Sequence, residues 1–149
     1  MIHLVTGGSG SGKSAYAEQC ILDFGGTRRV YIATMQPFGA EGQARIARHR
    51  KMRAAKKFST IECYTNLKEV ELEPGSDVLL ECMSNLTANE IFDPSGAGKA
   101  RAEEEILAGV SRLAHQARNL VLVTNEIFSD GYRYEDCLLY TSPSPRDGL

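Results

Sequence analysis

Residues 3–19 read HLVTGGSGSGKSAYAEQ, and this stretch decides the fold. Within it, residues 7–14 match the pattern G-x-x-x-x-G-K-[ST], which opens at Gly7 and closes at Gly12-Lys13-Ser14. Glycines let the backbone turn sharply and approach a ligand, so that successive N–H groups point at one anion. The helix that should follow adds its positive N-terminal end. The stretch therefore predicts a loop that holds the phosphates of a nucleoside triphosphate.

Two side chains of this loop have predicted chemical roles. Lys13 would place its ammonium group on the outer phosphates, and Ser14 would offer its hydroxyl to Mg²⁺. The alternative is a flexible Gly/Ser linker, but linkers rarely lie between a buried strand and a helix. The nucleotide-binding residues predicted in the loop are Gly7, Gly8, Ser9, Gly10, Ser11, Gly12, Lys13 and Ser14.

Apolar runs and helical patterns alternate along the rest of the chain. We expect strands at 2–6, 28–35, 77–85 and 120–126, and helices at 13–24, 39–58 and 97–119. Residues 58–67 should be extended or irregular. Strands that are apolar throughout and separated by helices form parallel sheets covered on both sides. The pattern predicts an α/β fold, a P-loop NTPase-like parallel sheet with helices on both faces.

The composition narrows the class of protein. A chain of 149 residues suits one domain, and a net charge of −2 disfavours nucleic acid as a partner. No apolar run reaches the length of about 18 residues that a membrane span needs. The four cysteines are scattered without a Cys-x-x-Cys pair, which gives no zinc or disulfide pattern and suits a reducing compartment. We therefore expect a cytoplasmic protein.

Residues 137–149, CLLYTSPSPRDGL, break the pattern. They contain two Ser-Pro pairs and no periodicity, whereas a sheet of this kind should continue with another helix and strand. We expect the fold to be incomplete, that is truncated, at the C-terminus. A P-loop nucleotide-binding domain would span 1–136, and 137–149 would be a non-native or disordered tail.

The expected strand ends supply the acidic partner of the loop. Ligands of open α/β sheets bind at the carboxyl ends of the strands. Glu81 follows the apolar run DVLL and is the natural carboxylate for Mg²⁺, although a solvated strand end is the alternative. Glu126 is a weaker candidate, for metal or for positioning the acceptor.

Residues 44–57 are dense in arginine and lysine around His49. On a helix Arg45, His49 and Arg53 would share one face. A solvated charged face is the usual meaning of such a run. The functional reading is that His49 accepts a nucleotidyl group covalently, while the cations neutralise the phosphate that it attacks.

Six motifs occur in an order that resembles one family: LVTGGSGSGKSAYAE, YIAT, ARIARHRKMR, FSTIE, LLECMSN and LVLVTNE. The chain resembles the bifunctional adenosylcobinamide kinase / adenosylcobinamide-phosphate guanylyltransferase family of cobalamin biosynthesis over about residues 2–136. The resemblance implies two reactions. A nucleoside triphosphate, ATP or GTP, phosphorylates adenosylcobinamide. GTP then donates GMP through an enzyme histidine to adenosylcobinamide phosphate, which gives adenosylcobinamide-GDP.

The resemblance also implies roles for residues of this chain. His49 would be the guanylylated residue. Some relatives carry two adjacent histidines where this chain has Arg48-His49, so His49 is the only candidate nucleophile in that motif. Lys13 would be the second catalytic residue. It further implies GTP, ATP and Mg²⁺ as ligands and a small homo-oligomer. The additional nucleotide-binding positions would be Ala33, Thr34, Met35, Arg50, Arg53, Glu62 and Glu81, with Ser14 and Glu81 at the metal.

Two alternatives remain open. The chain could be another P-loop kinase of a small metabolite, or a non-catalytic switch driven by nucleotide binding. A kinase alone would have no use for His49 within a cationic helix. A switch would combine slow hydrolysis with a large conformational response.

Overall fold

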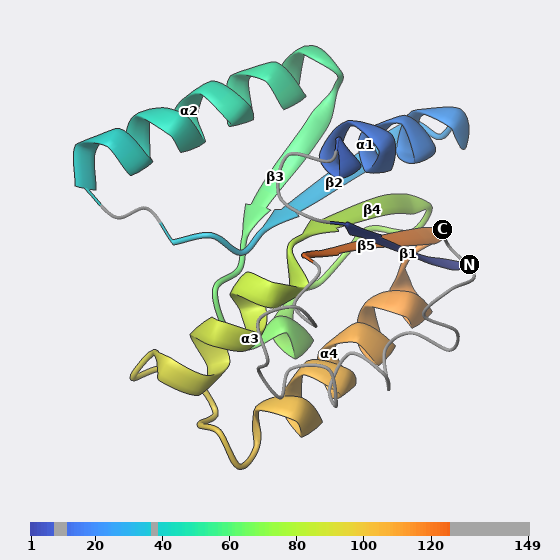
Figure 1. The fold of residues 1–149 in the computed structure, drawn as a ribbon. Coiled ribbons are helices and arrows are strands. Elements are labelled where there is room, and N and C mark those ends of the chain that lie inside the picture. The colour runs from blue at the N-terminus through green and yellow to red at the C-terminus, as the bar shows by residue number, and fades with distance from the viewer. Residues whose placement is uncertain (8–11, 37–38, 126–149) are drawn as a thin grey trace.

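The computed structural model of the protein describes residues 1–7, 12–36 and 39–125 (Figure 1). The predictions for Gly8, Ser9, Gly10, Ser11 and Glu126, and for the tail 137–149, lie outside these residues. The elements in chain order are β1 (Ile2–Gly7), α1 (Lys13–Asp23), β2 (Arg28–Ala33), α2 (Gly39–Ala55), β3 (Phe58–Glu62), the short 3₁₀ helix η1 (Leu67–Glu69), β4 (Ser76–Glu81), α3 (Met83–Phe92), α4 (Ala102–Gln116) and β5 (Asn119–Asn125).

The five strands form one parallel sheet in the order β1-β5-β4-β2-β3. β4 and β5 lie inside the sheet, and Val78, Leu80, Leu120 and Leu122 are at most 1% exposed. Leu79 and Val121, which face the opposite side of the sheet, are 0% exposed. Strands buried on both faces contain nearly continuous apolar runs, which is the pattern that the sequence shows. The predicted fold class is confirmed.

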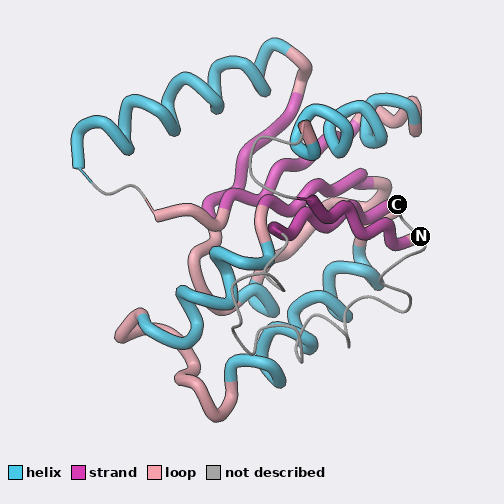
Figure 2. The backbone as a smooth tube through the Cα atoms, in the orientation of Figure 1, coloured by secondary structure: helices cyan, strands magenta, loops and turns pink. Residues whose placement is uncertain are grey.

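Helices cover both faces of the sheet, as Figures 1 and 2 show. α1 packs on one face, where Ala17 and Ile21 meet Leu79 and Val121. α3 and α4 pack on the other face, where Leu86, Ile106 and Leu113 join the larger core cluster. None of the helices in the described part of the chain is long and apolar enough to cross a membrane.

Helix α2 differs from the others because it is exposed along most of its length. Arg53, near its C-terminal end, is its only buried residue. In the chain α2 connects β2 to β3. Figure 1 shows it running back above these strands, with its N-terminal end directed away from the rest of the sheet. The charged sequence of α2 explains this position, since it offers no apolar stripe for the sheet.

One prediction of secondary structure is wrong, and another is made more specific. The expected strand 77–85 ends at Glu81, and residues 83–92 form α3. Cys82 has an extended backbone and its Sγ accepts a hydrogen bond from the N–H of Asn85 at 3.4 Å, which caps the helix. Residues 58–62 form a regular edge strand paired with β2, where the sequence left an extended or irregular segment.

Candidate active site

The parallel sheet brings four of the predicted site residues to the same end of the strands. Gly7 ends β1, Ala33 ends β2, Glu62 ends β3 and Glu81 ends β4. In the register of the sheet Ala33 lies opposite Glu62 on one side and opposite Glu81 on the other. The predicted set therefore converges at the carboxyl ends of the strands, where open α/β sheets bind their ligands.

The described end of the phosphate loop begins helix α1. Gly12 precedes the helix with a φ of 82°, a left-handed conformation that glycine adopts without strain. Lys13 and Ser14 then form the first turn, so their backbone N–H groups belong to the positive end of the helix. This geometry suits an anion.

Ser14 meets the predicted metal carboxylate directly. Its hydroxyl donates a hydrogen bond to Oε2 of Glu81. The contact brings together two side-chain oxygens from elements far apart in the sequence, and hard oxygen ligands are what Mg²⁺ takes. Among the described residues no group of three or more histidine, cysteine or acidic side chains gathers as a metal cage. Mg²⁺ at phosphates needs only one or two protein oxygens, so the pair fits it.

Tyr31 holds the second oxygen of the same carboxylate. Its hydroxyl donates a hydrogen bond of 3.1 Å to Oε1 of Glu81. Burial, and next the negative charge of Glu81, raises the pKa of Tyr31 far above its usual value. The phenol thus keeps its proton and remains a donor. The sequence analysis missed Tyr31, although a phenol within an apolar strand is a signal that the hydroxyl needs a partner.

Thr34 joins the end of β2 to the start of α3. Its hydroxyl donates to the carbonyl of Cys82 at 2.8 Å and accepts from the N–H of Cys82 at 2.8 Å. Its own carbonyl accepts a hydrogen bond from Nδ2 of Asn89 at 2.8 Å. These contacts hold the backbone at Thr34, the middle one of the predicted nucleotide-binding residues Ala33, Thr34 and Met35, and engage the Thr34 side chain within the protein.

The basic helix contributes two contacts on different sides. The guanidinium of Arg53 lies over the ring of Tyr31, 3.6 Å from its centroid. Arg50 forms an ion pair with Glu62 at the end of β3. Arg50 and Glu62 also line part of a cavity of about 390 Å³ between α2 and β3. The other lining residues are Gln43, Ile46, Ala47, Lys51 and Ala54.

His49 is exposed and does not line that cavity. It lies four residues before Arg53 and so shares the helix face that meets Tyr31. α2 runs antiparallel to the strands (Figure 1), so one turn toward its N-terminus leads toward their carboxyl ends, by about 6 Å. His49 therefore lies one helical turn closer than Arg53 to the carboxyl ends of the strands.

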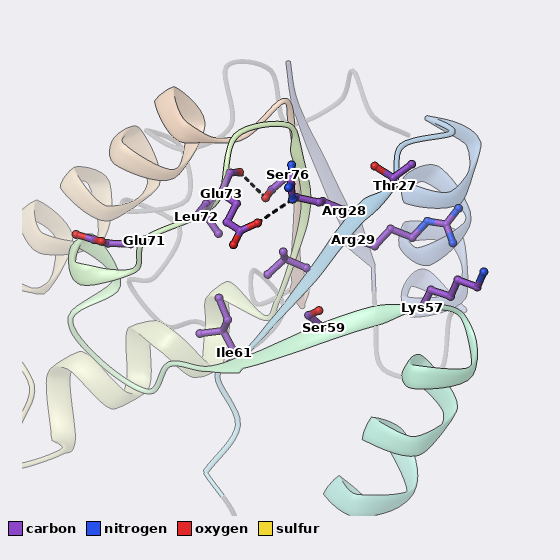
Figure 3. A pocket seen from close by; sticks show the side chains of 11 residues that line it. Thr27, Arg28, Arg29, Lys57, Ser59, Ile61, Glu71, Leu72, Glu73 and Ser76 are labelled. Atoms are coloured by element: carbon purple, nitrogen blue, oxygen red, sulfur yellow. Dashed lines mark hydrogen bonds and ion pairs between the residues drawn. The ribbon is translucent and has the colours of Figure 1, made fainter.

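A second cavity, of about 350 Å³, lies at the opposite end of the sheet and receives none of the predicted residues (Figure 3). Its arginines are engaged within the protein. Arg28 pairs with Glu73 at 2.9 Å and donates to the carbonyl of Pro74, and Arg29 donates to the carbonyl of Lys56 at 3.0 Å. The carboxyl end of the sheet is the candidate active site.

Comparison with known proteins agrees with this geometry. The family described as cobinamide kinase / cobinamide phosphate guanyltransferase matches residues 3–136. The "Bifunctional adenosylcobalamin biosynthesis protein CobU" of Escherichia coli (strain K12) is 35% identical over 140 residues, which covers 85% of this chain and 76% of that protein. The protein of the same name from Salmonella typhimurium is 36% identical over 140 residues, with the same coverage. The chain therefore belongs to the cobinamide kinase / cobinamide phosphate guanyltransferase family.

Proposed function

We propose that this chain phosphorylates adenosylcobinamide and then transfers GMP from GTP to the resulting phosphate, a step of adenosylcobalamin biosynthesis. The observation that carries the proposal is the contact of Ser14 with Glu81. This contact joins the helix that follows the phosphate loop to the acidic end of β4. It pairs a serine hydroxyl with a carboxylate, the two kinds of oxygen that hold Mg²⁺ in phosphoryl transfer by P-loop proteins.

In the first reaction the chain positions a triphosphate against the hydroxyl of the corrinoid. The loop and the N-terminal end of α1 bind the phosphates, and Lys13 neutralises charge on the outer ones. Ser14 and Glu81 would hold Mg²⁺, which supplies charge neutralisation at the phosphate oxygens. The donor would be ATP or GTP.

In the second reaction His49 is the nucleophile. A ring nitrogen attacks the α-phosphorus of GTP, a P–N bond forms, the bond to the β-phosphate oxygen breaks and pyrophosphate leaves, while the other ring nitrogen loses its proton to solvent. A phosphate oxygen of adenosylcobinamide phosphate then attacks the same phosphorus, so that a P–O bond forms, the P–N bond breaks and the imidazole of His49 takes a proton back from solvent. Arg50 lies one residue away, and a nucleotide that displaced Glu62 from it would find a bidentate donor there. Arg53, one turn away, keeps its place over Tyr31 and adds positive charge on the same helix face.

The proposal also includes a cytoplasmic location and a homo-oligomeric state for the enzyme. The described cysteines, Cys20, Cys63 and Cys82, are free thiols, as in the cytoplasm. The long exposed surface of α2 leaves room for contact with a second copy of the chain, in agreement with the homo-oligomer that the family resemblance implies.

The covalent step can be tested with GTP labelled at the α-phosphate. We expect the protein to acquire a label that is labile in acid and stable in alkali, and the His49→Ala variant to acquire none. His115→Ala is the matched control, because His115 is also an exposed helical histidine. A label that persists in His49→Ala would place the nucleophile elsewhere. A kinase that takes no label at all would be the metabolite kinase of the alternative reading.

A further inference from the structure

Tyr31 touches both halves of the candidate active site. It lies on β2, between the strand that ends in Glu81 and the edge strand β3. Its hydroxyl reaches the carboxylate of Glu81 at 3.1 Å, and its ring carries the guanidinium of Arg53 at 3.6 Å. One side chain thus contacts the metal-binding carboxylate and the helix that bears His49.

The contact with Glu81 fixes a carboxylate that is only partly buried. Ser14 donates to Oε2 and Tyr31 donates to Oε1, so each oxygen has its own donor. Two donors from different elements prevent rotation of the carboxylate about its last bond. Partners of this kind orient a metal ligand before the metal arrives, and their loss costs about 10- to 100-fold in metal affinity or activity.

The contact with Arg53 anchors α2. Arg53 is 5% exposed, and its buried Nε has no hydrogen-bond partner among the described residues. The ring of Tyr31 therefore supplies a favourable contact to a desolvated cation. Two ion pairs at or near α2 are exposed to solvent to a larger extent: Arg50 pairs with Glu62, and Lys56, just after the helix, pairs with Glu18 at 2.7 Å. Exposed pairs of that kind contribute little.

We propose that Tyr31 is a positioning residue that couples the Glu81 carboxylate to helix α2, and so sets the place of His49 relative to the bound triphosphate. The proposal rests on the proposed function, since it assigns a role within the same site. A shift of β2 or of the carboxylate would be passed through the phenol to the guanidinium of Arg53, and from there one helical turn to His49.

Two substitutions separate the two contacts. Tyr31→Phe removes the hydroxyl and keeps the ring, so it should act on Glu81 and leave α2 in place. Arg53→Leu removes the guanidinium and keeps the phenol, so it should release α2 while the Tyr31–Glu81 hydrogen bond remains. Tyr16→Phe is the matched control, because Tyr16 is 61% exposed on α1.

The first readout is the magnesium dependence of nucleotide binding, measured by calorimetry with α,β-methylene GTP, which cannot guanylylate a histidine. We expect Tyr31→Phe to raise the half-saturating Mg²⁺ concentration about tenfold or more, while affinity for the analogue in EDTA is unchanged. Tyr16→Phe should match the wild type. A purely structural role for Tyr31 would lower the melting temperature without this magnesium-specific shift.

The second readout is hydrogen exchange of the α2 backbone. Arg53→Leu should speed exchange over residues 46–55 roughly tenfold, and Tyr31→Phe should not. Unchanged magnesium dependence in Tyr31→Phe, or unchanged exchange in Arg53→Leu, would overturn the coupling. Failure of the wild type to bind the analogue at any Mg²⁺ concentration would instead overturn the proposed function, and the exchange experiment would still decide the anchoring of α2.

Discussion

The hydroxyl of Ser14, in the first turn of α1, donates a hydrogen bond to the carboxylate of Glu81 at the end of β4, across 67 positions of sequence. The parallel sheet creates this contact, since it places the start of the helix after β1 beside the end of β4. The contact defines where the proposed metal would sit.

Removal of this hydroxyl should weaken the kinase reaction. We expect Ser14→Ala to lower the rate of phosphate transfer to adenosylcobinamide by one to two orders of magnitude, because the metal loses one ligand and Glu81 loses a donor. The measurement is the rate as a function of Mg²⁺ concentration, with Ser111→Ala, an exposed serine of α4, as the control. A magnesium dependence identical to that of the wild type would show that Ser14 does not serve the metal.

Gly109 should tolerate no side chain. It lies on α4 against η1, and a Cβ added there would be 2.7 Å from Cβ of Leu67 and 3.0 Å from the backbone nitrogen of Lys68. We expect Gly109→Ala to lower the free energy of unfolding by about 1–3 kcal/mol, despite the better helix propensity of alanine. Urea unfolding measures it. Ala108→Gly, at an exposed position next to it, should cost about 1 kcal/mol through propensity alone.

Glu90 should be essential for the loops around α3. It is 2% exposed, and its two carboxylate oxygens accept the N–H groups of Asn66 and Ala97, each at 2.9 Å. Glu90→Gln turns one oxygen into a donor that faces another donor. We expect a loss of about 1–3 kcal/mol in urea unfolding, against less than about 0.5 kcal/mol for Glu104→Gln at the surface. Equal losses would mean that these hydrogen bonds contribute nothing.

The stability of the protein should fall in alkaline solution partly through Cys63. Burial, and then the negative charges of Glu90 and Glu69, raises the pKa of Cys63 from 9.0 to about 11. Between these two values the folded chain keeps a proton that the unfolded chain loses, so the free energy of unfolding decreases as the pH rises.

Comparison with a variant isolates this thiol, because burial also raises the pKa of Cys82. From pH 9 to 11 the wild type should lose up to about 2–3 kcal/mol more than Cys63→Ala. Urea unfolding under reducing conditions at each pH gives both curves. Parallel curves would show that Cys63 titrates normally in the folded state.

The parts of the fold that sequence reasoning predicted are those with strong local patterns. Helix α1 begins directly after Gly12, and β4 and β5 contain the apolar runs at 78–80 and 120–123. Helix α3 was missed because it is short and begins directly after a buried strand, so that Met83 and Leu86 extend the apolar run at helical spacing. Local sequence does not distinguish these periods over so few residues.

The sequence offers candidate site residues but not the contacts between them. Spacing placed Arg45, His49 and Arg53 on one face of a helix, yet only the packing of α2 on β2 makes Arg53 buried while the other two are exposed. Tyr31 was missed for the same reason. Its role depends on Glu81 and Arg53, which lie 50 and 22 positions further along the chain.

The position of β1 at the margin of the sheet also governs when the protein can assemble. Its described ladder is with β5, where Ile2 lies opposite Leu120 and Gly7 opposite Asn125. During synthesis β1 can therefore pair only after β5, the last described strand, has left the ribosome. Closing the long loop between β1 and β5 slows assembly. Nascent chains that contain only the first three strands should therefore expose β1, an unpaired apolar strand, to chaperones.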